Sequence, residues 1–98
     1  MYILYGCPET ATFGPHAVLE EAGLPYTREL INTNTGGCRT PEYLAINPAG
    51  YVPALKLDDG TIMCEAAAIM LYLADKSGLP DLAPRVDEPQ RAPFLRQL

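Results

Sequence analysis

The apolar positions of this chain follow two different spacings, which together predict a small domain of strands and helices. Short runs rich in β-branched, aromatic and aliphatic residues predict four strands, at 2–5, 27–31, 54–57 and 61–64. Apolar side chains at helical spacing predict three helices, at 17–22, 41–46 and from 66 to just before Gly78. The predicted order is β-α-β-α-β-β-α, an α/β fold with one crossover helix long enough to join two parallel strands.

Glycine and proline residues mark where these elements begin and end. Gly23 closes the first helix, and Pro41 opens the second, because proline is well tolerated at the first helical position. The polar stretch 9–15 predicts a connection between the first strand and the first helix. The Asp-Asp-Gly sequence at 58–60 predicts a hairpin with a two-residue loop, since Asp-Gly tolerates the positive φ angles of such a loop.

Composition argues against several classes of function. The chain of 98 residues is long enough for one small domain with a modest core. Its 7 basic and 12 acidic residues give a net charge of −5 without a basic patch, which argues against nucleic acid or an anionic membrane as a partner. The longest apolar run, 66–74, is far shorter than the roughly 20 residues of a membrane span. No charged segment precedes the first strand, so a secretory signal is not expected and the predicted compartment is the cytoplasm.

Candidate metal and redox residues are few and widely separated. The three cysteines, Cys7, Cys38 and Cys64, fit neither a disulfide framework nor a zinc pattern. His16 is the only histidine and has no evident ligand partner, so no metal is predicted. Cys7 follows the first strand, but position 10, where a second cysteine of a C-x-x-C pair would stand, is Thr10. A monothiol oxidoreductase that uses Cys7 stays open as one alternative.

The texture of the sequence changes after residue 79. Four prolines interrupt the remaining stretch, which has little periodicity until apolar residues return near the end, at Phe94, Leu95 and Leu98. We therefore expect a domain at 1–79, followed at 80–98 by an interdomain linker and the start of a missing all-helical domain.

A constrained turn at 47–55, with the sequence Asn-Pro-Ala-Gly-Tyr-Val-Pro-Ala-Leu, precedes the third predicted strand. The bond between Val52 and Pro53 is only weakly biased toward trans, as before any proline. If it is cis, the N–H and C=O groups of Val52 point outward. An extended peptide could then pair with Val52 as if it added a strand to a sheet edge.

The turn is part of a longer resemblance. The runs at 19–26, 41–44, 47–55, 59–60, 65–69 and 72–73 resemble, in order and spacing, the N-terminal domain of the cytosolic glutathione transferases, with the bacterial type as the expected group. The resemblance covers about residues 1–80. It implies a thioredoxin-like sandwich built on a mixed four-stranded sheet.

The resemblance implies glutathione as co-substrate. In the family, the residue matching Val52 pairs its main chain with the cysteinyl part of the tripeptide, next to a cis-proline matching Pro53. The residues matching Glu65 and Ala66 receive the γ-glutamyl end. Ala66 stands where the family usually has serine, so one hydroxyl donor is lost, a cost of roughly 0.5–1.5 kcal/mol.

The residue that stabilises the thiolate has several candidates. Counting forward from the first strand, the serine-type position of the family falls on Thr10; counting back from the first helix, it falls on Thr12, and the cysteine-type position falls on Ala11. Tyr5 stands where the tyrosine-type classes carry their catalytic residue. The remaining possibility is that none of these residues is an effective donor.

Three functions follow as hypotheses. The first is the glutathione-binding domain of a transferase that conjugates the glutathione thiolate to small electrophiles. Because the second domain forms most of the electrophile pocket in the family, we expect little or no activity from the 98 residues alone. The resemblance also implies a homodimer in the full-length protein. The second hypothesis is a non-catalytic, transferase-like module for protein–protein interaction, and the third is the Cys7 oxidoreductase.

Overall fold

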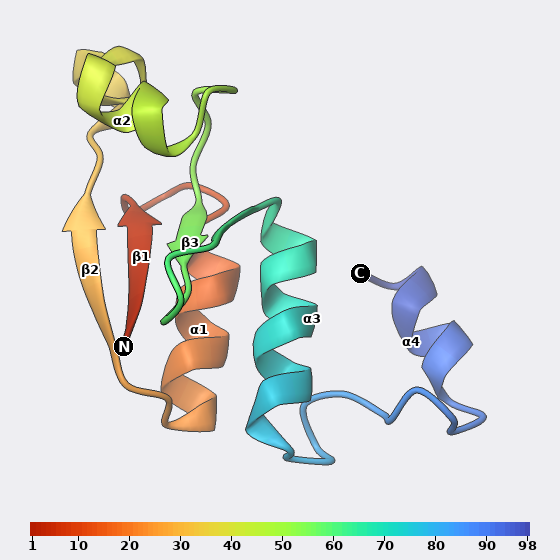
Figure 1. Cartoon of the computed structure of the whole chain (residues 1–98). Helices are drawn as coiled ribbons and strands as arrows, with labels where there is room; N and C mark the ends of the chain where they lie inside the picture. Colours follow the sequence, from red (N-terminus) through yellow and green to blue (C-terminus); the bar gives the residue numbers. More distant parts are fainter.

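The fold is built on a mixed four-stranded sheet (Figure 1). The computed structural model describes all 98 residues. The strands are β1 (Tyr2–Gly6), β2 (Tyr26–Leu30), β3 (Ala54–Lys56) and β4 (Ile62–Cys64), in the spatial order β2-β1-β3-β4. β1 and β2 are parallel, whereas β3 is antiparallel to both β1 and β4. The predicted α/β fold with a mixed sheet is therefore confirmed.

Helices lie on both sides of this sheet. The α-helices are α1 (Phe13–Ala22), α2 (Pro41–Ile46), α3 (Ala66–Ser77) and α4 (Arg91–Arg96), with two short 3₁₀ turns, η1 (Thr33–Thr35) and η2 (Gly37–Arg39), before α2. α1 and α3 pack side by side on one face, where Leu4, Leu19, Leu55, Ile69 and Leu73 form the main core. Successive strand residues point to opposite faces. Tyr5 accordingly lies in a second buried cluster, with Tyr43 of α2 and Ala54.

The helix boundaries follow the residues that the sequence singled out. Gly23 and Gly78 follow α1 and α3 in the left-handed conformation, with φ of 65° and 68°. That conformation is favourable for glycine because it has no Cβ. The hydroxyl of Thr40 accepts a hydrogen bond from the N–H of Tyr43, and Pro41 opens α2.

Two local predictions were wrong. α1 begins at Phe13, so the connection is shorter than 9–15. Pro15 lies in the first helical turn, where its missing N–H would have had no intrahelical acceptor. The hairpin loop has three residues rather than two: the N–H of Leu57 donates to the C=O of Thr61, with 58–60 between them. Gly60, with φ of 91°, then reverses the chain after an ordinary turn.

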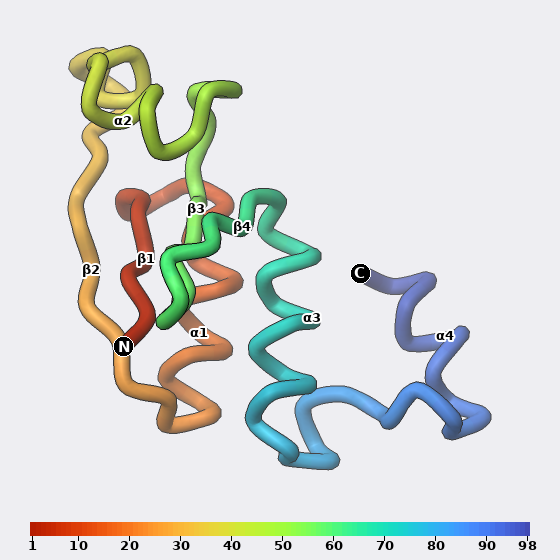
Figure 2. Tube along the Cα trace, viewed as in Figure 1, coloured from red at the N-terminus to blue at the C-terminus, as the bar shows by residue number.

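The segment after α3 extends away from the sheet and ends in α4 (Figure 2). Arg91 connects this segment to α3. Its guanidinium donates to both carboxylate oxygens of Asp75 on α3, at 3.0 and 3.3 Å, and to the C=O of Pro84 at 2.7 Å. No helix in the structure combines the length and the apolar character that a bilayer span requires.

Candidate functional site

The end of the sheet where β1 stops brings three distant segments together. In the strand register, Ala54 pairs with both Tyr5 and Cys64. The residues just beyond these positions therefore meet at one edge: the β1–α1 loop, the turn before β3, and Glu65 at the start of α3. These are the segments from which the sequence predicted a site.

The turn before β3 is fixed by hydrogen bonds. The C=O of Tyr51 accepts from the hydroxyl of Tyr43 at 2.5 Å and from the amide nitrogen of Asn47 at 2.9 Å. Burial raises the pKa of Tyr43 to about 12, so its hydroxyl keeps its proton and acts as a donor at neutral pH. Gly50 adopts a φ of 74° in the same turn.

Val52 lies in this turn with its main chain unpaired. The Val52–Pro53 peptide bond is cis, which is the isomer that the family resemblance implied. Pro53 is buried and Val52 is half-buried. Neither the N–H nor the C=O of Val52 has a hydrogen-bond partner in the chain, although the neighbouring C=O of Tyr51 has two. A main-chain donor and acceptor are thus available side by side.

The N-terminus of α3 adds further free donors. Glu65 precedes the helix with a φ of 72°, and no side chain caps the helix. The first amides of α3, from Ala66 onward, have no acceptor within the helix. A non-glycine residue in this conformation costs of order 1–3 kcal/mol, and such strain concentrates at binding sites. The carboxylate of Glu65 is exposed and forms no ion pair.

The three candidate thiolate donors lie in different surroundings. Thr12 is buried, with 7% of its surface exposed, and its side chain packs against Gly6. The hydroxyl of Thr10 lies 2.8 Å from that of Thr12 and 2.7 Å from the C=O of Cys7. Tyr5 lies on the other side of the sheet, 4% exposed, and burial raises its pKa. The structure therefore brings Thr10 and Thr12 together and separates Tyr5 from them.

Cys7 precedes these two threonines, and hydrogen bonds act on its thiol. Its sulfur lies 3.6 Å from the hydroxyl of Thr33. Burial opposes ionisation, but hydrogen bonds from Thr33 and Thr10 outweigh it and lower the pKa of Cys7. No group of three His, Cys, Asp or Glu side chains is placed to hold a metal ion.

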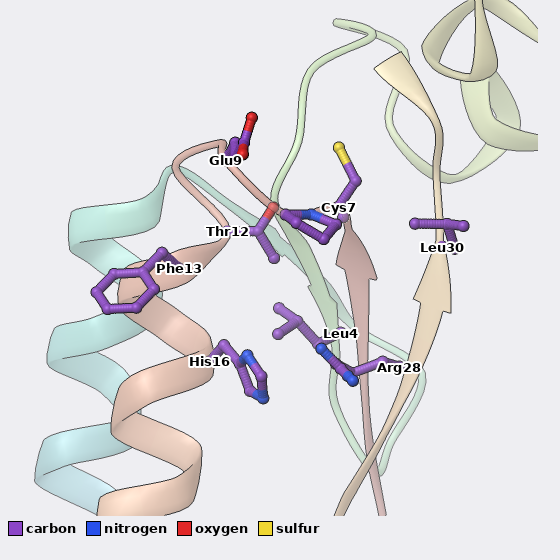
Figure 3. A pocket seen from close by; sticks show the side chains of 10 residues that line it. Leu4, Cys7, Glu9, Thr12, Phe13, His16, Arg28 and Leu30 are labelled. Atoms are coloured by element: carbon purple, nitrogen blue, oxygen red, sulfur yellow. The ribbon is translucent and has the colours of Figure 1, made fainter. Parts of the chain in front are cut away.

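A pocket of about 620 Å³ opens between α1 and the strands β1 and β2 (Figure 3). Its lining includes apolar side chains, Phe13 and Leu30 among them, and four polar ones, Glu9, Thr12, His16 and Arg28. Neither Val52 nor Glu65 lines it, so this pocket and the main-chain edge are neighbouring but distinct features.

His16 is held in place at the wall of this pocket. Its Nε2 lies 2.9 Å from the hydroxyl of Tyr26, which donates a hydrogen bond to Glu20 one helical turn further along α1. Because the tyrosine proton is given to Glu20, Nε2 of His16 must carry the proton of the first bond. The imidazole is therefore part of a side-chain network that joins α1 to β2.

Arg39 is a candidate that sequence reasoning missed. Its guanidinium packs against Gly50, where an added Cβ would come within 2.8 Å of Nη1. It is exposed and has no acidic partner. Spacing along the chain gives no signal for this contact, because it depends on how η2 and the turn before β3 fold against each other.

Comparison with known proteins identifies the family. Residues 12–76 match the family model described as the glutathione S-transferase N-terminal domain. The chain belongs to this family. This glutathione S-transferase domain is 41% identical over 81 residues to glutathione S-transferase GstA of Escherichia coli O157:H7. The alignment covers 80% of this chain and 38% of GstA.

Solved structures agree. A glutathione transferase homolog from Sulfitobacter, crystallised with bound glutathione, superimposes with a TM-score of 0.88 at 38% identity, covering 99% of this chain and 46% of that one. A glutathione transferase from Methylococcus capsulatus gives 0.87 at 37% identity, covering 98% and 48%. The chain thus spans less than half the length of these relatives.

Proposed function

We propose that this glutathione S-transferase domain binds glutathione and serves as the glutathione-binding half of a transferase that conjugates the thiolate to small electrophiles. The observation that carries the proposal is the unpaired main chain of Val52 next to the uncapped N-terminus of α3. The glutathione bound to the Sulfitobacter homolog, which matches nearly the whole chain, supports the choice of ligand.

The proposed pose follows from the groups available. The cysteinyl part pairs with the N–H and C=O of Val52, beside Pro53, as in strand addition. The γ-glutamyl carboxylate accepts from the first amides of α3, at Ala66, and the ammonium pairs with the carboxylate of Glu65. The glycyl carboxylate, at the far end of an extended tripeptide, is placed toward the unpaired guanidinium of Arg39.

In this pose the thiol points to the β1–α1 loop, and Thr12 is the preferred hydrogen-bond donor to the thiolate. The position of Thr12 supports this role, because Thr12 lines the pocket between α1 and β2. That pocket, with Phe13 and Leu30 at its walls, then offers this domain's contribution to the electrophile site. Tyr5 is disfavoured because its buried hydroxyl belongs to the opposite face.

The remaining proposals concern the whole protein. Residues 1–79 form the glutathione-binding domain, and 80–98 form a linker and the start of a helical domain that completes the electrophile pocket. We expect the full-length protein to act as a cytoplasmic homodimer, and this chain alone to conjugate slowly or not at all.

Calorimetric titration of glutathione into the chain tests the binding. Glu65→Gln should weaken binding at least about tenfold, because it removes a charge-assisted hydrogen bond to the ammonium. The matched control is Glu21→Gln, which changes an exposed carboxylate on a different helix, α1. This variant should bind glutathione like the original chain. Absence of any binding heat in the unsubstituted chain would favour the non-catalytic interaction module instead.

A further inference from the structure

The hydroxyl of Thr10 lies within hydrogen-bond distance of two oxygen acceptors but has only one proton. It lies 2.7 Å from the C=O of Cys7 and 2.8 Å from Oγ1 of Thr12, both within good hydrogen-bond distance. A hydroxyl can donate one hydrogen bond while accepting others. The C=O of Cys7 cannot donate at all, so the contact between the two threonines must change direction according to where the Thr10 proton goes.

Two arrangements satisfy this geometry. In the first, Thr10 donates to the C=O of Cys7, and Thr12 donates to Thr10. In the second, Thr10 donates to Thr12, which frees the Thr12 proton but leaves the C=O of Cys7 without a partner, since no other hydrogen bond reaches it. The first arrangement satisfies every group when the site is empty, so it is favoured in the free domain.

The Thr12 side chain is held in place, so its oxygen cannot move away from Thr10. Its side chain packs so closely on Gly6 that a Cβ added there would lie 2.1 Å from Oγ1. Its N–H also donates to the hydroxyl of Thr10 at 3.3 Å. In Figure 3 the Thr12 hydroxyl points toward the loop that carries Cys7. The proton can change its acceptor, but the oxygen stays where it is.

We infer that Thr10 is a positioning residue that retains the proton of Thr12 in the empty site and releases it when a thiolate binds. The inference rests on the proposed function, in which glutathione places its sulfur beside Thr12. A thiolate accepts a stronger hydrogen bond than a neutral hydroxyl does, so it draws the pair into the second arrangement. The thiol proton leaves to water, and the cost is the lost bond to the C=O of Cys7.

Thr10 therefore makes the bound thiol less acidic than Thr12 alone would. Thr10→Val keeps the shape but removes the competing acceptor, so the Thr12 proton is available at no cost. We expect the pKa of bound glutathione to fall by about half a unit to one unit, the equivalent of one neutral hydrogen bond. Thr10→Ser keeps the hydroxyl and should behave like the original chain.

The measurement is the ultraviolet absorbance of the thiolate in the glutathione-saturated chain as a function of pH. The same variant saturated with S-methylglutathione serves as the blank, because it cancels the protein's own thiols. The other titratable or charged groups around this site are Cys7 and Glu9 on the loop, His16 on α1 and Arg28 on β2. They are unchanged in sequence in both variants, and the blank corrects for the effect of Thr10 on Cys7.

The outcomes separate cleanly. A lower thiol pKa in Thr10→Val, with Thr10→Ser unchanged, supports the inference. An unchanged or higher pKa in Thr10→Val, with glutathione still bound, overturns it, as does a bound thiol pKa that does not rise in Thr12→Val. If glutathione does not bind the unsubstituted chain, the proposed function itself fails.

Discussion

Gly6, the last residue of β1, is a position where adding a single methyl group should destabilise the fold. A Cβ added at Gly6 would lie 2.1 Å from Oγ1, 2.4 Å from Cγ2 and 2.7 Å from Cβ of Thr12. All three atoms belong to one buried side chain directly before α1. The φ of Gly6 is not in the left-handed region, so the expected effect of Gly6→Ala is one of packing alone.

The magnitude follows from overpacking a site that cannot relax cheaply. Thr12 is only 7% exposed and is hydrogen-bonded to Thr10, so relief requires α1 to shift against β1. Such overpacking costs about 1–3 kcal/mol. In a domain of this size, that lowers Tm by roughly 5–20 °C.

Thermal unfolding followed by circular dichroism measures this effect, and Gly14→Ala is the matched control. A Cβ at Gly14 would also meet another side chain closely, at 2.6 Å, but the atom is the sulfur of Met70, near the end of a flexible side chain. Moving it is cheap, and alanine gains roughly 0.5–1 kcal/mol over glycine within a helix. Gly14→Ala should therefore leave Tm unchanged or raise it.

A second substitution tests the cause. Thr12→Ala removes the two closest atoms, so Gly6→Ala should cost about 1 kcal/mol less in that background than in the original chain. A cost for Gly6→Ala below about 0.5 kcal/mol, or one that is the same with and without the Thr12 side chain, would refute the packing argument.

Three further predictions concern other parts of the chain. Tyr43→Phe removes the donor to the C=O of Tyr51 and should lower the free energy of unfolding by about 1–2 kcal/mol in urea titrations. Because the folded pKa of Tyr43 is raised from 10.0 to about 12, its neutral form stabilises the fold below pH 10. That contribution is lost as pH rises toward 12, so the alkaline loss of stability should be shallower in Tyr43→Phe. Ala66→Ser should tighten glutathione binding by about 2- to 12-fold in calorimetry, by restoring a hydroxyl donor at the start of α3; equal or weaker binding would contradict the proposed pose. Arg91→Gln should speed proteolytic cleavage within 79–90, with less than a few degrees of change in Tm, since the Arg91–Asp75 pair that holds the tail is only partly covered; unchanged cleavage would mean that other contacts anchor the tail.

The sequence predicted the elements well where local chemistry decides them. Gly23 and Gly78 end helices because no other residue adopts the left-handed conformation as easily, and Pro41 starts one for the reason given above. The hairpin loop was predicted one residue too short, because Asp-Gly at 59–60 is compatible with both a two-residue and a three-residue loop. Only the pairing of Leu57 with Thr61 distinguishes them.

The candidate site was predicted only in part, because its remaining features depend on contacts between distant segments. The cis bond at Val52 and the uncapped start of α3 follow the pattern of the motifs. The contact of Arg39 with Gly50 and the pocket between α1 and β2 do not, since they arise from how segments pack. Nor does a count along the chain choose between Thr10 and Thr12, whereas the structure assigns them complementary places in one hydrogen-bond network.

The conformation of Glu65 creates a conflict for anyone who seeks a more heat-resistant form of this domain. Replacing Glu65 by glycine would relieve a backbone angle that a side chain adopts with difficulty, so a screen for thermal tolerance alone would favour that change. The same change would remove the carboxylate that lies directly before α3. Stabilised variants selected without a ligand in the assay should therefore be checked at this position first.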